Sequence, residues 1–122
     1  MAGEKILLVE DHPVNRRLAG FLLRSQGYQV REATTAQEAF EMLKNQQADL
    51  IVMDIQLPGM NGLDATTKLK AEPATANIPV IAVTSYAMPG DREKALAAGC
   101  SGYVTKPIDK TIFLAEISRH LK

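Results

Sequence analysis

Hydrophobic residues fall into four short runs, and each run ends on a polar residue of a different chemical kind. The runs are 6–9 before Glu10 and Asp11, 50–53 before Asp54, 80–83 before Thr84, and 103–105 before Lys106. Runs of this length, bounded by turn residues, are typical of strands. The run at 50–53 is unbroken and contains large and β-branched side chains, which favours a central strand that is buried on both faces.

Segments with apolar residues at helical spacing alternate with these runs. A short further strand is expected at 28–32. The expected helices are Pro13 to about Ser25, Ala36 to near Asn45, one from about Leu63, one from near Pro89 to Gly99, and one that Asp109 caps and that carries Phe113, Ile117 and Leu121. The alternation predicts an α/β fold of five βα units around a parallel sheet.

The polar residues after the runs form the candidate site. The carboxyl ends of neighbouring parallel strands converge, so two or three acids, a hydroxyl and an ammonium are expected to meet in one crevice. Asp54 is the expected nucleophile, since phosphoryl transfer depends mostly on positioning and electrostatics. The alternative is that Asp54 only caps or turns the chain.

Glu10 and Asp11 add negative charge beside Asp54, which is costly unless a hard cation lies among the oxygens. Mg²⁺ fits a site with few carboxylates because it keeps several waters and bridges to phosphate oxygens. Asp11 could instead be a helix N-terminal carboxylate ahead of Pro13, and the two roles are compatible.

Lys106 and Thr84 supply the remaining chemistry. The Lys106 ammonium suits pairing with Asp54 before reaction and with a phosphoryl oxygen afterwards. Taken alone, a lysine after a strand is more often a solvated surface charge. The Thr84 hydroxyl is able to donate to a phosphoryl oxygen.

Composition limits the other possibilities. A chain of 122 residues with 46% hydrophobic content is expected to be one domain, 1–122. The 14 basic and 14 acidic residues balance, so neither nucleic acid nor membrane is an expected partner. Cys100 is the only cysteine, which excludes an internal disulfide. The first apolar run is too short for a signal peptide, and we expect a cytoplasmic protein.

Four motifs together resemble the receiver domains of bacterial two-component response regulators. They are Val-Glu-Asp at 9–11, Met-Asp-Ile-Gln-Leu-Pro-Gly-Met-Asn-Gly at 53–62, Val-Thr at 83–84 and Tyr-Val-Thr-Lys-Pro at 103–107. The local sequences at 11–18 and 86–88 are similar to those of stand-alone regulators of the DivK type and of receiver modules of hybrid histidine kinases. The resemblance implies a doubly wound, flavodoxin-like (βα)5 three-layer sandwich with strand order 2-1-3-4-5.

The resemblance also implies a reaction and a ligand set. A histidine kinase or histidine phosphotransfer protein would donate a phosphoryl group to Asp54, and the chain would catalyse only its own phosphorylation and autodephosphorylation, so it is not an enzyme in the usual sense. Asp11 and Asp54 would bind Mg²⁺ directly, with the backbone carbonyl of Gln56 as a third ligand and Glu10 acting through water. Mn²⁺ is an expected substitute.

Further roles follow from the same resemblance. The Lys106–Pro107 bond would be cis, and Tyr103 would move with Thr84 as a two-position switch on the face formed by the fourth helix, fifth strand and fifth helix. The alternative for Tyr103 is an ordinary strand aromatic. Gln56 and Tyr86, each two residues beyond a site residue, are expected to modulate the phosphoryl lifetime.

The expected partners are proteins. The donor would dock against the first helix, where Val14 and Leu18 are expected to be partly exposed, and a downstream target would bind the switch face. The chain would be a monomer or a weak phosphorylation-dependent dimer, and it has no room for a DNA-binding output domain.

Three rival functions have less support in the sequence. A nucleotide or flavin binder would use a Gly-rich loop after the first strand, but residues 10–13 are acidic there and would repel phosphate in the absence of a metal. A phosphatase would need a general acid two residues beyond Asp54, where Gln56 stands. A scaffold with a degenerate site is disfavoured because every required residue type is present.

Overall fold

Five parallel strands form one sheet in the order β2-β1-β3-β4-β5. The coordinates are a computed structural model that describes residues 3–85 and 89–121. The strands are β1 Lys5–Val9, β2 Gln29–Ala33, β3 Leu50–Asp54, β4 Val80–Thr84 and β5 Gly102–Thr105. The helices are α1 Pro13–Ser25, α2 Ala36–Asn45, α3 Gly62–Ala71, α4 Asp91–Ala98 and α5 Lys110–Arg119.

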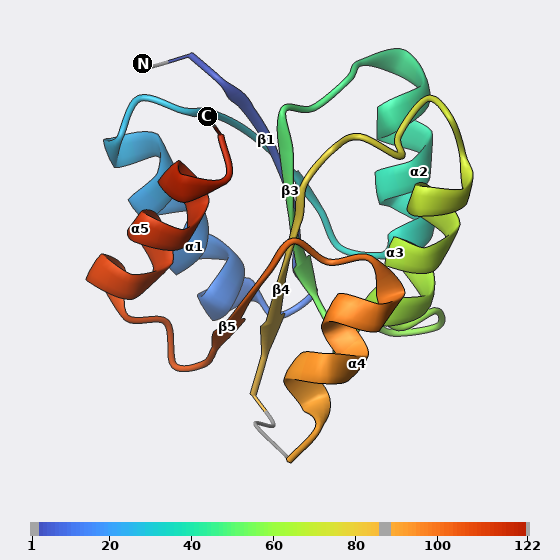
Figure 1. The fold of residues 1–122 in the computed structure, drawn as a ribbon. Coiled ribbons are helices and arrows are strands. Elements are labelled where there is room, and N and C mark those ends of the chain that lie inside the picture. Colours follow the sequence, from blue (N-terminus) through green and yellow to red (C-terminus); the bar gives the residue numbers. More distant parts are fainter. Residues whose placement is uncertain (1–2, 86–88, 122) are drawn as a thin grey trace.

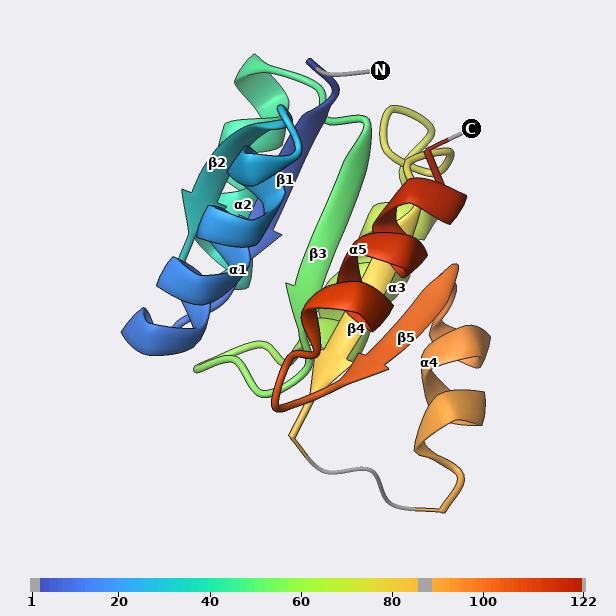
Figure 2. The same cartoon turned by 90° about the vertical axis from the view of Figure 1, so that its left-hand side faces the viewer.

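The helices cover both faces of the sheet. Figure 1 shows α1 and α5 on one side, and α2, α3 and α4 on the other. In the view turned by 90°, α1 crosses in front of β1 and β2, and α5 lies in front of β4 and β5 (Figure 2). The sequence-based prediction of a doubly wound three-layer sandwich with strand order 2-1-3-4-5 is confirmed.

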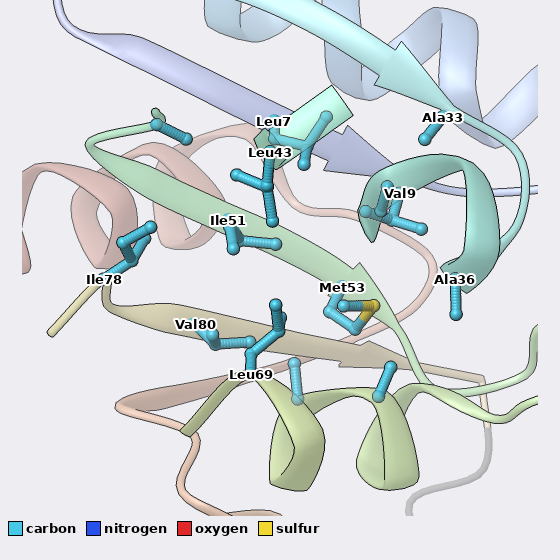
Figure 3. Packing of buried hydrophobic residues seen from close by; sticks show 14 of the residues in the cluster. Leu7, Val9, Ala33, Ala36, Leu43, Ile51, Met53, Leu69, Ile78 and Val80 are labelled. Carbon is cyan, nitrogen blue, oxygen red and sulfur yellow. The ribbon is translucent and has the colours of Figure 1, made fainter. Parts of the chain in front are cut away.

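Each central strand sends alternate side chains into two separate cores. In β3, Ile51 and Met53 join the cluster beneath α2, α3 and α4, whereas Leu50 and Val52 join the cluster beneath α1 and α5. Figure 3 shows Ile51 and Met53 facing Leu43 of α2 and Leu69 of α3. Because both faces are buried, the strand reads as an unbroken apolar run instead of an alternating one.

Several boundaries differ from the predicted ones by one or two residues. Helix α4 begins at Asp91 and not near Pro89, because Gly90 has a φ of 89° and the left-handed conformation interrupts the helix there. Strand β2 lies one residue later than expected. Leu121 lies beyond the end of α5 but still packs against the core with Phe113 and Ile117.

Three helices carry the expected kind of cap. The side chains of Thr35, Asn61 and Asp109 each accept a hydrogen bond from the backbone N–H three residues later, at the starts of α2, α3 and α5. Among residues 3–85 and 89–121, no helix has the length and apolar character of a membrane span.

Candidate functional site

The candidate site lies where the strand order reverses. The chain leaves β1 towards β2 on one side, and β3 then pairs with the other side of β1. In sheets of this kind the carboxyl ends of the strands open into a crevice at that position. Asp54 is the last residue of β3, Glu10 and Asp11 follow β1, Thr84 ends β4 and Lys106 follows β5.

Three carboxylates meet at this end of the sheet. One oxygen from each of Glu10, Asp11 and Asp54 lies within 4.8 Å of the other two. Glu10 and Asp54 are buried, at 3% and 2% exposure, whereas Asp11 is exposed. The first residue of α1 is Pro13 and the cap position before it is His12, so Asp11 is not the capping residue. Because the Asp11 carboxylate faces solvent, it is the carboxylate of the cluster that a hydrated cation reaches most easily.

Lys106 neutralises part of the buried charge. Its Nζ lies 3.0 Å from Glu10 Oε1 and 3.4 Å from Asp54 Oδ2. The Lys106 side chain is 9% exposed, so the alternative of a solvated surface charge is wrong. The Lys106–Pro107 peptide bond is cis. The arrangement holds one ammonium against two carboxylates, which leaves the described cluster with an excess of negative charge.

The excess of negative charge contributes to a raised pKa of Asp54. The pKa of Asp54 is raised to about 7, chiefly by burial and then by a hydrogen bond to the Glu10 side chain and by the charge of Glu10. The Lys106 charge and the backbone N–H of Gln56 act in the opposite direction. A cation with two positive charges would offset both the cost of burying the Asp54 charge and the repulsion from Glu10, so the donor set fits a hard divalent ion.

The loop after β3 packs tightly against Asp54. A Cβ on Gly62 would lie 2.2 Å from the carbonyl oxygen of Asp54, so only glycine fits at the start of α3. Gly62 N–H also donates to the carbonyl of Ile55 at 2.9 Å. The backbone N–H of Gln56 donates to Asp54 Oδ1 at 3.1 Å. The Gly-rich loop thus holds the carboxylate in one orientation.

Gln56 also reaches the end of β4. Its Nε2 donates to Thr84 Oγ1 at 2.9 Å, and its Oε1 accepts from the backbone N–H of Ser85 at 3.3 Å. The Thr84 side chain is fully buried. Tyr86, predicted to act with Gln56, lies outside the described residues.

Tyr103 lies on β5 near the start of α4. The residue is half-buried and packs against the core beneath α2, α3 and α4. Its hydroxyl is buried and makes no hydrogen bond to the described part of the chain. Burial raises the pKa of the Tyr103 hydroxyl, and the charge of Asp91 adds to this effect.

The sequence reasoning missed Arg16. Its Nη1 donates to the backbone carbonyls of Glu10 and Asp11, at 3.2 Å each, and its Nε pairs with Glu32 on β2 at 3.3 Å. The available signal in the sequence was an arginine one turn into a helix that follows two acidic residues. This signal is not specific, because the pairing of Arg16 with Glu32 becomes visible only when the fold places β2 beside α1.

Comparison with known proteins agrees with the fold. The sequence-family model described as the response regulator receiver domain matches residues 6–118 of this chain. The polar-differentiation response regulator DivK of Brucella ovis is 38% identical over 118 residues, covering 97% of this chain and 96% of DivK.

Two solved structures are similar over nearly the whole chain. The receiver domain of a sensor histidine kinase from Pseudomonas aeruginosa, solved with a magnesium ion coordinated in its active site cleft, is 38% identical, with a TM-score of 0.89 and 98% of each chain covered. The chemotaxis protein CheY4 of Vibrio cholerae is 25% identical, with a TM-score of 0.91 and coverage of 98% of this chain and 100% of CheY4.

Fold and site together define a phosphoacceptor signalling domain. The chain belongs to the response regulator receiver domain family of two-component systems. Members of this family are signalling domains and not enzymes in the usual sense, and they work with histidine kinases and downstream targets.

Proposed function

We propose that Asp54 accepts a phosphoryl group from a phosphohistidine on a kinase or phosphotransfer protein. The observation that carries this proposal is the buried acidic cluster with Lys106 bridging Glu10 and Asp54. In the transfer, an oxygen of Asp54 forms a bond to phosphorus while the P–N bond of the donor breaks, and the electron pair leaves with the donor imidazole. Water later attacks the acyl phosphate, which returns the free carboxylate and inorganic phosphate.

Asp11 and Asp54 would hold Mg²⁺ directly, with the backbone carbonyl of Gln56 as a third ligand and Glu10 acting through water. Such an ion neutralises charge on the phosphoryl oxygens. The exposed position of Asp11 and the raised pKa of Asp54 support the assignment. Mn²⁺ has the same preference for oxygen ligands and is expected to substitute.

Lys106 and Thr84 would bind the transferred group. The Lys106 ammonium exchanges its contact with Asp54 for one with a phosphoryl oxygen, because phosphorylation removes one carboxylate oxygen from the pair. The Thr84 hydroxyl accepts a hydrogen bond from Gln56 Nε2, and a hydroxyl that accepts is also able to donate, so Thr84 would donate to a phosphoryl oxygen after the transfer. Movement of Thr84 towards the phosphoryl group would leave space for the Tyr103 ring.

The two faces used for signalling would be different. The donor would dock on α1, where Val14, Leu18 and Phe21 form an apolar stripe, at 65%, 40% and 68% exposure. The target would bind the face formed by α4, β5 and α5, which contains Tyr103. Gln56 and Tyr86 would set how easily water reaches the phosphoryl group.

The remaining expectations stay proposals. Residues 1–122 would form a single receiver domain that acts in the cytoplasm and binds neither nucleic acid nor membrane. It would be a monomer or a weak dimer once phosphorylated. Its catalysis would be limited to its own phosphorylation and autodephosphorylation.

Intact-mass spectrometry after incubation with acetyl phosphate tests the proposal. The wild-type chain should gain one phosphoryl group in Mg²⁺ and none in a chelator. Asp54→Asn should gain none in either condition, and Asp64→Asn is the matched control, since Asp64 is an aspartate of the same chain outside the acidic cluster.

An adduct that persists in Asp54→Asn would assign the acceptor to another residue. A folded wild-type chain that gains no mass in any condition would favour a binding module that works without phosphorylation.

A further inference from the structure

Arg16 contacts both residues that bring carboxylates from β1 to the site. Its Nη1 donates to the carbonyl oxygens of Glu10 and Asp11, each at 3.2 Å. We propose that Arg16 is a positioning residue: it holds the turn at these two residues in the shape that presents both carboxylates to Asp54. This inference rests on the proposed metal site, because it assigns a function to the geometry of that site.

The acidic turn needs an external constraint. Successive side chains of an extended strand point to opposite faces. The backbone N–H of Glu10 still donates to Ala33 at the end of β2, at 2.9 Å, so for Glu10 and Asp11 both to lie within 4.8 Å of Asp54 the chain must leave strand geometry between these two residues. Repulsion among three carboxylates opposes this arrangement before a cation is bound. Arg16 donates to the backbone carbonyl oxygens of the turn. It therefore restrains the backbone without occupying a carboxylate oxygen that a cation would need.

Arg16 is itself held from two directions. Its backbone N–H donates to the carbonyl of His12 at 2.9 Å, as part of the first turn of α1. Its Nε pairs with Glu32 Oε1 on β2 at 3.3 Å, and the side chain is only 24% exposed. The planar guanidinium therefore joins a helix, a strand and the acidic turn, a geometry that the single ammonium of lysine does not reproduce.

Arg24 provides a matched control within the same ion-pair network. Its Nη2 lies 3.0 Å from the other carboxylate oxygen of Glu32 and donates to the carbonyl of Val30 at 3.3 Å. Arg24 thus has the same acidic partner and one backbone contact. Among the interactions of the described residues, Arg24 has none with Glu10 or Asp11. A difference between equivalent substitutions at the two arginines isolates the contact with the acidic turn.

The test compares Arg16→Lys with Arg24→Lys in the full chain, since both variants keep the net charge. Mg²⁺ affinity is measured by isothermal titration calorimetry, and stability is measured by urea unfolding in a chelator. We expect Arg16→Lys to weaken Mg²⁺ binding about tenfold, in the range seen when groups behind metal ligands are altered. Arg24→Lys should change the affinity by less than about twofold, while the two variants lose similar stability.

Equal losses of Mg²⁺ affinity in the two variants, or an unchanged affinity in Arg16→Lys, would overturn the proposal. If Arg16→Lys does not fold, Arg16→Gln is compared with Arg24→Gln, so that the two variants again have the same net charge. A wild-type chain that binds no Mg²⁺ would contradict the proposed metal site itself. That outcome is distinct, because it is seen before any variant is compared.

Discussion

Gln56 and Thr84, which lie 28 residues apart in the chain, share a hydrogen bond of 2.9 Å at the edge of the crevice. Gln56 also donates its backbone N–H to Asp54 Oδ1. One residue therefore contacts both the proposed acceptor and the proposed switch hydroxyl. Under the proposed switch, a Thr84 side chain that moves towards a phosphoryl group would have to give up this hydrogen bond.

Removal of the Gln56 amide should favour the switched state. Gln56→Met keeps the length of the side chain but offers no N–H, so Thr84 should be freer to turn towards a phosphoryl group. We expect the affinity for beryllofluoride, a phosphoryl analogue, to rise about threefold to tenfold, corresponding to one hydrogen bond. Fluorine NMR of the bound analogue gives the measurement.

The control is the same substitution in a Thr84→Val background. Valine has the shape of threonine without the hydroxyl, so Gln56→Met should then have little effect on affinity. An equal gain in both backgrounds would show that the effect does not pass through Thr84.

The raised pKa of Asp54 predicts how stability depends on pH without metal. Folding raises this pKa from 3.8 to about 7, so the folded chain holds the proton more tightly than the unfolded chain. The stabilisation from this group is complete below about pH 4 and is lost as pH rises to about 7. Asp54→Asn does not titrate and should be more stable than the wild type near pH 8, by on the order of 2–4 kcal/mol.

Urea unfolding in a chelator, repeated from about pH 4 to about pH 8, gives this difference directly. The advantage of Asp54→Asn should shrink steadily towards the acidic end. A constant difference across the range would mean that Asp54 titrates normally in the folded chain.

Lys106 is predicted to stabilise the free site, and a divalent cation should replace it. Lys106→Met leaves Glu10 and Asp54 buried without their shared ammonium, which should cost about 3 kcal/mol. Addition of Mg²⁺ should stabilise this variant more than it stabilises the wild type, because the ion relieves a larger repulsion. Thermal unfolding with and without Mg²⁺ measures both effects.

Lys44→Met serves as the control for Lys106→Met. Lys44 pairs with Glu41 at 3.4 Å, but its side chain is 70% exposed. The loss should be below about 1 kcal/mol and should not depend on Mg²⁺. A similar loss at both lysines would show that burial of Lys106 adds nothing to its pairing.

The apolar stripe on α1 is predicted to affect protein donors and not small ones. Phe21→Ser should slow phosphotransfer from a phosphorylated histidine phosphotransfer protein about tenfold, as expected for an aromatic anchor residue. The rate with acetyl phosphate should not change, because Phe21 lies on the exposed surface of α1.

Leu96→Ser is the matched surface variant, since Leu96 is exposed on α4. Transfer from the protein donor should be normal in this variant. A slower rate in both variants would assign the donor to a broader surface than α1.

Much of the fold was predictable because it depends on local signals. The unbroken runs at 50–53 and 80–83 predict central strands, since a strand buried on both faces needs apolar side chains at every position. The cap at Asp109 was also predictable from its position before an apolar stripe. The predicted start of α4 was about two residues early, because Pro89 suits a first helical turn, whereas the Pro-Gly pair at 89–90 forms a turn in which Gly90 is left-handed.

The chemical groups that meet at one end of the sheet could be predicted from the printed chain, because each apolar run ends on a polar residue and parallel strands bring these ends together. How those groups interact depends on the fold. The pKa of Asp54 depends on burial and on Glu10, 44 residues earlier, and the support of the acidic turn depends on Arg16 and Glu32 meeting across α1 and β2. Burial and long-range charge pairing are properties of three-dimensional neighbours, which local sequence does not encode.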